Sequence, residues 1–550
     1  MKQQARRVVA FANRKLSVKT AAILLAGSIL LSSLLGILRS RLLNGYYLDT
    51  YPTGIDAYTV AFIIPDFMFS ILVSGALTVT FVPVFNQLRN DKRYKDNRGA
   101  WELTSSVLNL MSLVTLGISV LIMIFAEPLI QYVVGPYLSE ASRALAASMM
   151  RVIAINPFLF SISGIMTSLQ QAYGRFFFYA IAPAVYNLGI ILGITMFTDG
   201  ITLFGWRVFD GGIMGVAIGV VFGSICQLAV SAIGVMGLGF KYSFKIFWDN
   251  EGFLKVLKIF PARSLDQGAD YLNSLVETRL ASGMAPGTIA SYYQALTLHT
   301  MPINLIGVAI SNAAFASMTE KLSLGQTGQF KREVRTILRT IVWIALPIAV
   351  ISFFARGYIV SFVKSGGNQL IAGLFGALVV AIFFRSIYHI LARTFYAQQD
   401  TKTPFYVSLV AITINIGLAV IFTTVFKFDA YGLAWSQSIT ALVEVIILSI
   451  AMRFKVKGIL DEQFMICFCK MVISAAVTSV ICYGLVLKMP LRETDKSFFV
   501  TFPKFCLISM TSVLVYFGLS RAFKLDEAQV ISQKIKRLIL PKPEEKQWPI

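Results

Sequence analysis

Charged residues are scarce in this chain. Asp, Glu, Lys and Arg make up 14% of its 550 residues, whereas soluble globular proteins carry roughly a quarter. So few charges could not cover the surface of a soluble fold of this length. Hydrophobic residues make up 56%, and apolar stretches of the roughly 20 residues that a helix needs to cross a bilayer recur along the chain. We therefore expect an all-α polytopic membrane protein.

The residues that usually build catalytic centres are also scarce. The chain has two histidines and five cysteines, and none of them has the spacing of a metal site. No glycine-rich phosphate loop is present, which argues against ATP hydrolysis. We expect no cofactor, no certain metal site and no enzymatic activity, and we interpret the chain as a transporter. The cysteines, which we expect to pack within membrane helices, are Cys226, Cys467, Cys469, Cys482 and Cys506.

About fourteen transmembrane helices are predicted. Their approximate ranges are 20–43, 55–88, 101–126, 141–172, 176–197, 212–238, 252–283, 287–320, 333–363, 369–398, 403–425, 431–453, 463–487 and 499–522. The formal net charge is +21, and the basic residues gather in alternate connections, such as 89–98 and 321–339. Since cytoplasmic loops are enriched in Lys and Arg, this alternation predicts that both termini are cytoplasmic.

An internal repeat relates the two halves of the chain. Residues 170–176 (QQAYGRF) and 186–189 (YNLG) correspond to 396–402 (YAQQDTK) and 414–417 (INIG). The offset equals six helices, an even number that preserves orientation, so we expect two parallel repeats. The predicted parts are an N-lobe at 1–240, a C-lobe at 241–455, two extra helices at 456–523 and a basic cytoplasmic tail at 524–550.

Ionisable residues within predicted spans mark candidate functional positions, because charge at membrane depth is costly. Span 252–283 carries Arg263, Asp266, Asp270 and Glu277 on one helical stripe, with Asn273 close to it. Such a stripe is expected to face a water-filled cavity or a polar helix. The alternative is an intrahelical salt-bridge ladder that only holds the bundle.

Two other predicted spans carry arginines that are candidates for a functional role. Arg39 can offer a planar fork of donors to a phosphate or a carboxylate, and Asp56 could hold that arginine in place. The alternative is that Arg39 only anchors the outer end of its helix. Arg385 and His389 lie deep in span 369–398, where His389 is expected to pack rather than to relay protons.

Several of these motifs together resemble the MurJ (MviN) lipid II flippases. The matching stretches are 35–39 (LGILR), 55–58 (IDAY), 64–65 (IP), 74–76 (SGA), 81–83 (FVP), 169–177 (LQQAYGRFF), 182–183 (AP), 187–189 (NLG) and 395–404 (FYAQQDTKTP). The resemblance implies the fold of the multidrug/oligosaccharidyl-lipid/polysaccharide exporter (MOP) superfamily. In this fold two six-helix lobes form a V around a central cavity, and the last two helices add a groove for a lipid tail.

The resemblance also implies roles for single residues. Arg39 matches an arginine expected to bind the substrate's pyrophosphate, and Asp56 matches an aspartate of the next helix. Asn273 and Glu277 fall where the family has an asparagine and an acidic residue, so that Glu277 could help to bind a coupling cation. Asn415 matches an asparagine linked to a sodium site.

Some family positions are occupied differently in this chain. Ser33, Phe69 and Ser70 stand where the family has arginines, Ser74 replaces a glutamate, and Ala419 replaces an acidic residue. We expect Arg263, Asp266, Asp270 and Arg385 to bind the substrate together with Arg39 and Asp56. Our hypothesis is that Arg263 and Arg385 supply the missing positive charge.

The leading hypothesis is a lipid II flippase of the bacterial inner membrane, monomeric and required for cell-wall synthesis. Its coupling would use Na⁺, H⁺ or the membrane potential. Its partners would be the lipid-linked muropeptide, membrane lipids and cell-wall synthesis proteins, with no nucleic acid. One alternative is an exporter of another polyprenyl-linked polysaccharide or of an amphipathic drug. The other is a non-transporting membrane scaffold for cell-wall enzymes.

Overall fold

The structure is a computed structural model that describes residues 18–539 except 75, 92, 94, 204, 205, 457, 460, 493 and 494. For some of these residues the structure describes the backbone but not the side chain. They are residues 18, 19, 21–23, 26, 73–79, 95, 201–209, 260–270, 316, 531 and 534–539. The chain forms two compact units, Met1–Ser291 and Tyr292–Ile550. The sequence repeat suggests a boundary at 240/241 instead. The two divisions differ in the long helix that follows residue 250, which groups with the first unit in the structure.

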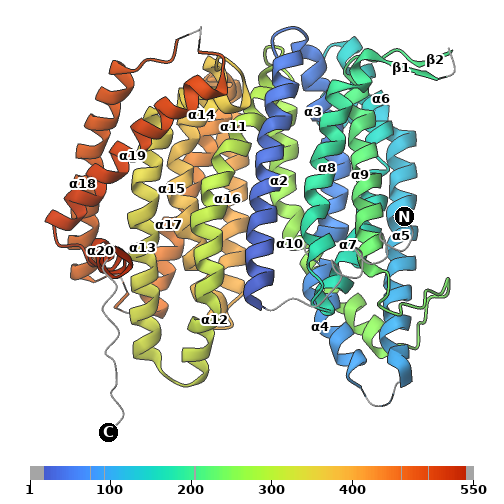
Figure 1. The fold of residues 1–550 in the computed structure, drawn as a ribbon, viewed down its shortest axis with the longest axis horizontal. Coiled ribbons are helices and arrows are strands. Elements are labelled where there is room, and N and C mark those ends of the chain that lie inside the picture. Colours follow the sequence, from blue (N-terminus) through green and yellow to red (C-terminus); the bar gives the residue numbers. More distant parts are fainter. Residues whose placement is uncertain are drawn as a thin grey trace. The chain divides into compact units, whose positions relative to one another are not determined.

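The first unit is a bundle of helices (blue to green in Figure 1). Its elements are α2 (Val18–Tyr47), α3 (Pro52–Phe69), η1 (Ser70–Ser74), α4 (Ala76–Arg89), η2 (Lys95–Asn97), α5 (Arg98–Pro128), η3 (Leu129–Val134), α6 (Glu140–Ile153), α7 (Asn156–Ala172), α8 (Phe177–Thr195), η4 (Phe197–Asp199), β1 (Ile201–Leu203), β2 (Trp206–Phe209), α9 (Met214–Val235) and α10 (Glu251–Ala281).

The second unit begins within α11 (yellow-green to red in Figure 1). Its elements are α11 (Thr288–Ile303), η5 (Asn304–Val308), α12 (Ala309–Ser323), α13 (Thr327–Phe354), α14 (Arg356–Val363), α15 (Gln369–Ala397), α16 (Lys402–Val420), η6 (Ile421–Val425), α17 (Asp429–Lys455), α18 (Glu462–Lys488), α19 (Phe498–Ala522) and α20 (Asp526–Ile539).

Every predicted span coincides with one helix or with consecutive helices, and the helical membrane fold is confirmed. Twelve helices of the described chain are long and apolar enough to cross a membrane. The other two predicted spans correspond to α2 and α10, which are helices of 30 and 31 residues. The count of fourteen spans thus stays a prediction. A small antiparallel hairpin, β1–β2, was not expected and joins α8 to α9.

Prolines explain where long predicted spans are broken. Span 141–172 is two helices, because α6 ends at Ile153 and α7 restarts with Pro157 in its first turn. Proline lacks an N–H, and it suits a helix start better than a helix interior. Pro128 stands immediately before the π-helical turn η3, and Pro302 stands just before the π-helical turn η5. The hydrogen bonds of a π-helical turn span five residues instead of the four of an α-helix, so the turn accommodates one extra residue.

Glycines bring α8 and α9 into very close contact in the first unit. A Cβ added to Gly189 would lie 2.2 Å from the Cα of Gly223, and one added to Gly219 would lie 2.4 Å from the Cα of Gly193. Helices in membranes gain stability from such close backbone approach, since burial against lipid supplies little hydrophobic driving force. Helix α2 packs against α8, one member of this pair.

Large side chains and a few polar contacts hold the second unit together. Trp343 of α13 donates from Nε1 to the Oγ of Ser520 at 3.0 Å, which joins α13 to α19. Arg339 of α13 pairs with Glu527 of α20 at 2.7 Å, and both side chains are nearly buried. Helices α18 and α19, the two expected outside the repeat, pack against each other and against α13. The start of the C-terminal helix α20 is therefore fixed to the transmembrane bundle.

The turns that follow α7 and α15 support the repeat at the level of the backbone. In the first, Gly174 has a φ of 69° and Arg175 N–H donates to the carbonyl of Gln170 at 2.9 Å. In the second, Gln399 has a φ of 60° and Asp400 N–H donates to the carbonyl of Phe395 at 3.0 Å. Both helices thus end with a left-handed residue and a hydrogen bond that spans five residues, a Schellman-type ending.

Candidate functional site

Arg39 lies on α2 within the first unit, where α2 packs against α8. Asn187 of α8 fixes this contact, because its Nδ2 donates to the Oγ of Ser32 at 3.2 Å and to the Ser32 carbonyl at 3.3 Å. Ser32 and Arg39 are seven residues apart, so they lie on the same face of α2. The Asn187 contact therefore sets the rotation of the helix that carries Arg39.

Acidic and phenolic groups surround Arg39. The guanidinium interacts electrostatically with Asp66 and Tyr58 of α3 and with Tyr186 of α8. Arg39 and Asp66 are both half-buried. Within the described residues, Arg39 makes no hydrogen bond or ion pair, so its five N–H donors are available to a ligand. A guanidinium in this state matches the geometry of a phosphate or a carboxylate.

Asp56 is placed differently from what its expected role suggests. Its side chain is buried and accepts hydrogen bonds from the backbone N–H groups of Gly287 at 2.6 Å and Ala290 at 2.8 Å. These amides belong to the turn before α11 and to its first residues, where helical N–H groups have no intrahelical acceptor. Among the described contacts of Asp56, none involves Arg39. The carboxylate fixes α3 to the start of α11.

The stripe expected on span 252–283 lies on the single helix α10. Asn273 Nδ2 donates to Glu277 Oε1 at 3.2 Å, and the Glu277 side chain is 1% exposed. A buried carboxylate with an amide partner one turn away is a costly arrangement for a membrane helix to keep. The side chains of Arg263, Asp266 and Asp270 lie outside the described residues.

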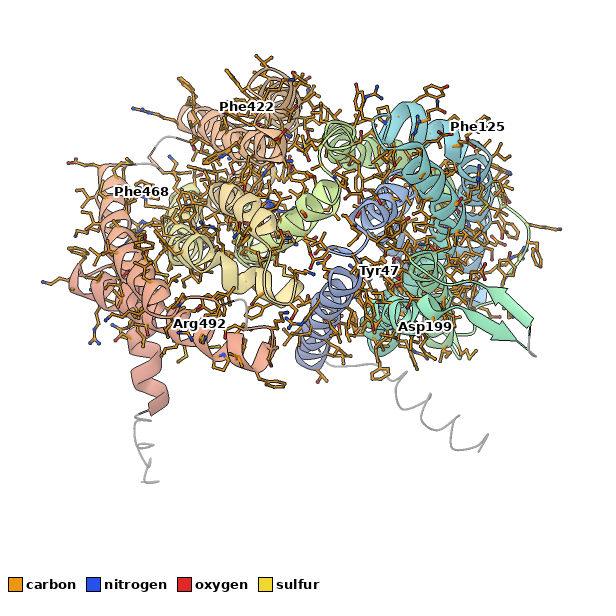
Figure 2. The ribbon with its side chains drawn as sticks, turned by 90° about the horizontal axis from the view of Figure 1, so that it is seen from above. Tyr47, Phe125, Asp199, Phe422, Phe468 and Arg492 are labelled. Carbon is orange, nitrogen blue, oxygen red and sulfur yellow. The ribbon has the colours of Figure 1, made fainter. Side chains whose placement is uncertain are left out.

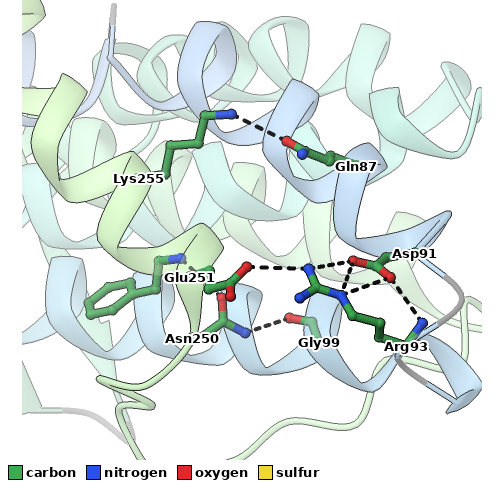
Figure 3. A network of polar contacts seen from close by, with 8 residues as sticks. Gln87, Asp91, Arg93, Gly99, Asn250, Glu251 and Lys255 are labelled. Carbon is green, nitrogen blue, oxygen red and sulfur yellow. Dashed lines mark hydrogen bonds and ion pairs between the residues drawn. The ribbon is translucent and has the colours of Figure 1, made fainter.

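The first turn of α10 is tied to the connection between α4 and α5 (Figure 3). Arg93 bonds both Asp91 at 2.9 Å and Glu251 at 3.3 Å, and Asn250 donates to the carbonyl of Gly99 at 3.0 Å. The hydrogen bonds from Arg93 hold the pKa of Asp91 below its usual range. This network fixes one end of the helix that carries Asn273 and Glu277.

Arg385 lies in a polar network of the second unit that joins three helices. Its Nη1 is 2.8 Å from Glu444 Oε2 on α17, and the Glu444 side chain is 2% exposed. Ser408 of α16 donates to the other Glu444 oxygen at 3.3 Å, and Tyr388 is 2.9 Å from Ser408. Breaking a buried pair of this kind leaves an uncompensated charge, which is strongly destabilising. The network therefore holds α15, α16 and α17 in one arrangement.

Asn415 of α16 is buried, and Thr440 of α17 donates to its amide oxygen at 3.5 Å. One turn further along α16, Ala419 is also buried. Sodium and other hard cations prefer several oxygen ligands, usually including a carboxylate. The amide and hydroxyl described here fit such an ion poorly without the acid that Ala419 replaces. Among the described residues, no group of three or more His, Cys, Asp or Glu side chains could hold a metal.

The sequence interpretation assigned no role to Tyr58, Asp66 or Tyr186. A signal was present for Asp66, which follows Pro65 in an otherwise apolar span, and for Tyr186, which precedes the repeated Asn187. The contact with Arg39 could not be inferred, because it depends on how α2, α3 and α8 pack. The Arg385–Glu444 pair depends in the same way on the packing of α15 and α17.

Known proteins are similar to this chain in sequence and in fold. The family model described as "Lipid II flippase MurJ" matches residues 52–502. The chain belongs to the lipid II flippase MurJ family. A relative from Borreliella burgdorferi, named a probable lipid II flippase MurJ, is 24% identical over 440 residues, which cover 78% of this chain and 82% of the relative.

Solved structures confirm the fold of the MurJ family and its superfamily. A lipid II flippase MurJ in an inward closed conformation matches with a TM-score of 0.73 and 23% identity, covering 92% of this chain and 99% of that one. An inward-facing multidrug resistance MATE family transporter of the MOP superfamily matches with a TM-score of 0.63 and 15% identity, covering 78% and 95%. The chain is thus a multi-pass membrane protein with a MOP-type transporter fold.

Proposed function

We propose that this chain is a lipid II flippase, which moves the undecaprenyl-pyrophosphate-linked muropeptide from the cytoplasmic to the outer leaflet of the inner membrane by alternating access. The family match over residues 52–502 supports the substrate class. Arg39 supports the mode of binding, since it is half-buried within the membrane bundle and its donors are uncommitted among the described residues. No chemical change of the substrate is needed.

Arg39 would bind the pyrophosphate. Asp66 would compensate the positive charge of Arg39 while no substrate is bound. A guanidinium close to a carboxylate keeps part of its favourable electrostatic energy when no ligand is present, which lowers the cost of burying it. An arriving pyrophosphate carries more negative charge than one carboxylate and offers a bidentate partner. Asp66 would then help to expel the phosphate once the site opens outward.

The other predicted residues have supporting roles in this proposal. Asp56 would act on the site by fixing α3 to α11, and Arg263, Asp266 and Asp270 would line the polar stripe of α10. Arg385 would contribute positive charge from its position beside Glu444. Asn273 and Glu277 would couple transport to a proton, to Na⁺ or to the membrane potential. Asn415, which resembles a sodium-site asparagine of the family, lacks the acidic neighbour that Ala419 replaces, so a part in coupling stays a prediction for it.

The placement in the membrane follows from the loop charges. We infer that both termini are cytoplasmic, since the connections on the same side, such as 89–98, are basic. The lipid-linked muropeptide is the expected substrate, surrounding lipids and cell-wall synthesis proteins are the expected partners, and the chain would act as a monomer.

A second candidate is an exporter of another polyprenyl-linked polysaccharide or of an amphipathic drug. Ser33, Phe69 and Ser70, which stand where the family has arginines, favour it. A scaffold without transport is the candidate from another class, and it predicts that the charges of α10 can be neutralised without effect.

Complementation separates these candidates. The native lipid II flippase of a bacterium would be depleted while this chain is expressed, with its membrane insertion verified. Restored growth and peptidoglycan synthesis support the flippase. Lysis despite insertion, combined with restoration of a surface polymer in a strain that lacks its exporter, would support the second candidate instead. Lysis despite insertion, with no surface polymer restored either, would support the scaffold.

A further inference from the structure

A cavity of about 400 Å³ opens at the turn between α16 and α17. It is lined by Lys427, Phe428, Asp429, Tyr431 and Trp435, whose side chains are all exposed at its walls. It is a shallow, open hollow rather than an enclosed pocket. The ring of Phe422, labelled in Figure 2, lies 6.0 Å from that of Phe426 and 5.8 Å from that of Phe428, tilted against both.

The backbone around this cavity is held in an unusual but defined shape. Lys427 and Asp429 have φ values of 56° and 47°, a region that residues other than glycine rarely adopt. The N–H of Phe428 donates to the carbonyl of Phe422 at 2.9 Å, and the N–H of Phe426 donates to that of Ile421 at 3.1 Å. Strained conformations of this kind persist only where the surrounding structure imposes them. The turn presents its two charged side chains from a fixed frame.

Neither charge has a partner in the described part of the chain. The ammonium of Lys427 and the carboxylate of Asp429 make no hydrogen bond or ion pair there, even with each other. They are two residues apart on the rim of one cavity. A ligand that carries one negative and one positive group would satisfy both, whereas a purely anionic ligand would satisfy only the lysine.

An exposed face runs along α16 towards this cavity. It consists of Tyr406, Leu409, Val410, Thr413, Gly417, Val420 and Ile421, all of them exposed and spaced three or four residues apart. This periodicity places them on one side of the helix. A mainly apolar face that runs the length of a membrane helix suits an acyl chain. The ligand is therefore expected to have a hydrocarbon tail, which argues for a lipid rather than a free sugar.

The rings beside the charges suit the headgroup level of a membrane. Tyr431 and Trp435 are 39% and 43% exposed. Tyrosine and tryptophan are enriched at the boundary between lipid and water. The face of a tryptophan ring also attracts an ammonium group, and this effect is strongest when water is partly excluded.

We propose that this cavity binds the headgroup of a zwitterionic phospholipid with a primary amine, phosphatidylethanolamine. Lys427 binds the phosphate. Asp429, together with the ring of Trp435, binds the ammonium group. An acyl chain lies along the exposed face of α16. The site serves as a fixed lipid contact of the second unit, shares no residue with the proposed transport site at Arg39, and stands whether or not the substrate is lipid II.

Native mass spectrometry of the full-length protein in detergent tests this site. The protein would be titrated with palmitoyl-oleoyl phosphatidylethanolamine and, in parallel, with the corresponding phosphatidylglycerol. We expect preferential retention of phosphatidylethanolamine. Lys427→Gln should lower retention of both lipids by about two- to fivefold, the effect of one exposed ion pair. Asp429→Asn should lower retention of phosphatidylethanolamine alone and remove the preference.

Suitable controls exist within the same unit. Neither substitution adds strain at the turn, because glutamine is no bulkier at Cβ than lysine, and asparagine tolerates a positive φ well. Lys488→Ala removes an exposed lysine from the end of α18, outside the cavity, and should leave retention of both lipids unchanged. Each variant is compared with the native protein for elution volume and thermal stability, so that misfolding is recognised.

Three results would overturn the proposal. One is equal retention of the two lipids by the native protein together with no effect of Asp429→Asn. Another is equal loss of retention in Lys488→Ala and Lys427→Gln, which would indicate attraction by surface charge in general. A third is binding of the disaccharide chitobiose that quenches Trp435 fluorescence, is lost in Asp429→Asn, and leaves lipid retention unchanged, since the cavity would then be a sugar site.

Discussion

At the residue scale, the described polar side chains fall into two kinds. Asp56, Asn187 and Glu444 have their hydrogen-bonding capacity directed at other parts of the protein, and they position helices. Arg39 differs, because its donors are uncommitted among the described residues although it is half-buried. Such a group is expensive to keep in a membrane bundle. It is therefore the described residue best suited to bind the substrate.

Asp56→Asn should destabilise the protein. The carboxylate accepts two backbone hydrogen bonds, and an amide oxygen would accept them less well while its NH₂ group faces the same donors. We expect a loss of about 1–3 kcal/mol, the cost of an imperfectly satisfied buried group. Thermal unfolding of the purified protein in detergent measures it. An unchanged midpoint with lost transport would instead assign Asp56 to the substrate.

Asp400→Asn should destabilise the protein in a pH-dependent way. Burial raises the pKa of Asp400, but hydrogen bonds from Lys455 and Thr403 outweigh this effect and hold the pKa well below its usual range. A carboxyl group with a lowered pKa in the folded state stabilises that state above its unfolded pKa of about 3.9, and the stabilisation is lost as the pH falls towards the folded value.

The unfolding midpoints of native and Asp400→Asn protein, compared from pH 7 down to pH 3, check this. The difference should be constant near neutral pH and should shrink below about pH 4. Lys524→Gln, an exposed residue after α19, serves as the control and should show no such trend. A difference that stays constant down to pH 3 would contradict the assignment.

At the element scale, most of the helices could be predicted from hydrophobic runs, since each run must cross the bilayer. The breaks could not be placed in the same way. The α6–α7 break and the turns η3 and η5 depend on prolines within runs that remain apolar throughout. The hairpin β1–β2 was also missed, because its few residues carry no alternation long enough to indicate strands.

Gly219→Ala should disrupt the α8–α9 contact. The added methyl group would lie 2.4 Å from the Cα of Gly193, so the two backbones must separate. Overpacking of this kind costs about 1–3 kcal/mol. Gly117→Ala on α5 is the matched control, because nothing lies within 4 Å of its added Cβ and alanine favours a helix. Thermal stability in detergent should fall only for Gly219→Ala, and equal midpoints would show that the close approach is unimportant.

At the scale of the whole molecule, the repeat and the family motifs were enough to identify the fold class. Motifs such as 169–177 and 395–404 form equivalent turns in the two halves, so their resemblance reflects the same local geometry. The candidate site was harder to predict. Arg39 could be identified as a candidate because placing a charged side chain within a membrane costs free energy. Its neighbours could not be identified, because they depend on helix packing that no single segment encodes; they are Asp66, Tyr58 and Tyr186.

The central claim is that Arg39 holds the pyrophosphate of lipid II during transport. The measurement that tests it most directly is lipid II exposure at the outer leaflet of cells that depend on this chain, comparing the native protein with Arg39→Ala, Arg39→Lys and Arg521→Ala, all inserted equally. We expect Arg39→Ala to lower exposure by about tenfold or more, the worth of one charge-assisted contact. Arg39→Lys should retain part of the activity, and Arg521→Ala, an exposed arginine at the end of α19, all of it. Full lipid II exposure with Arg39→Ala would contradict the account.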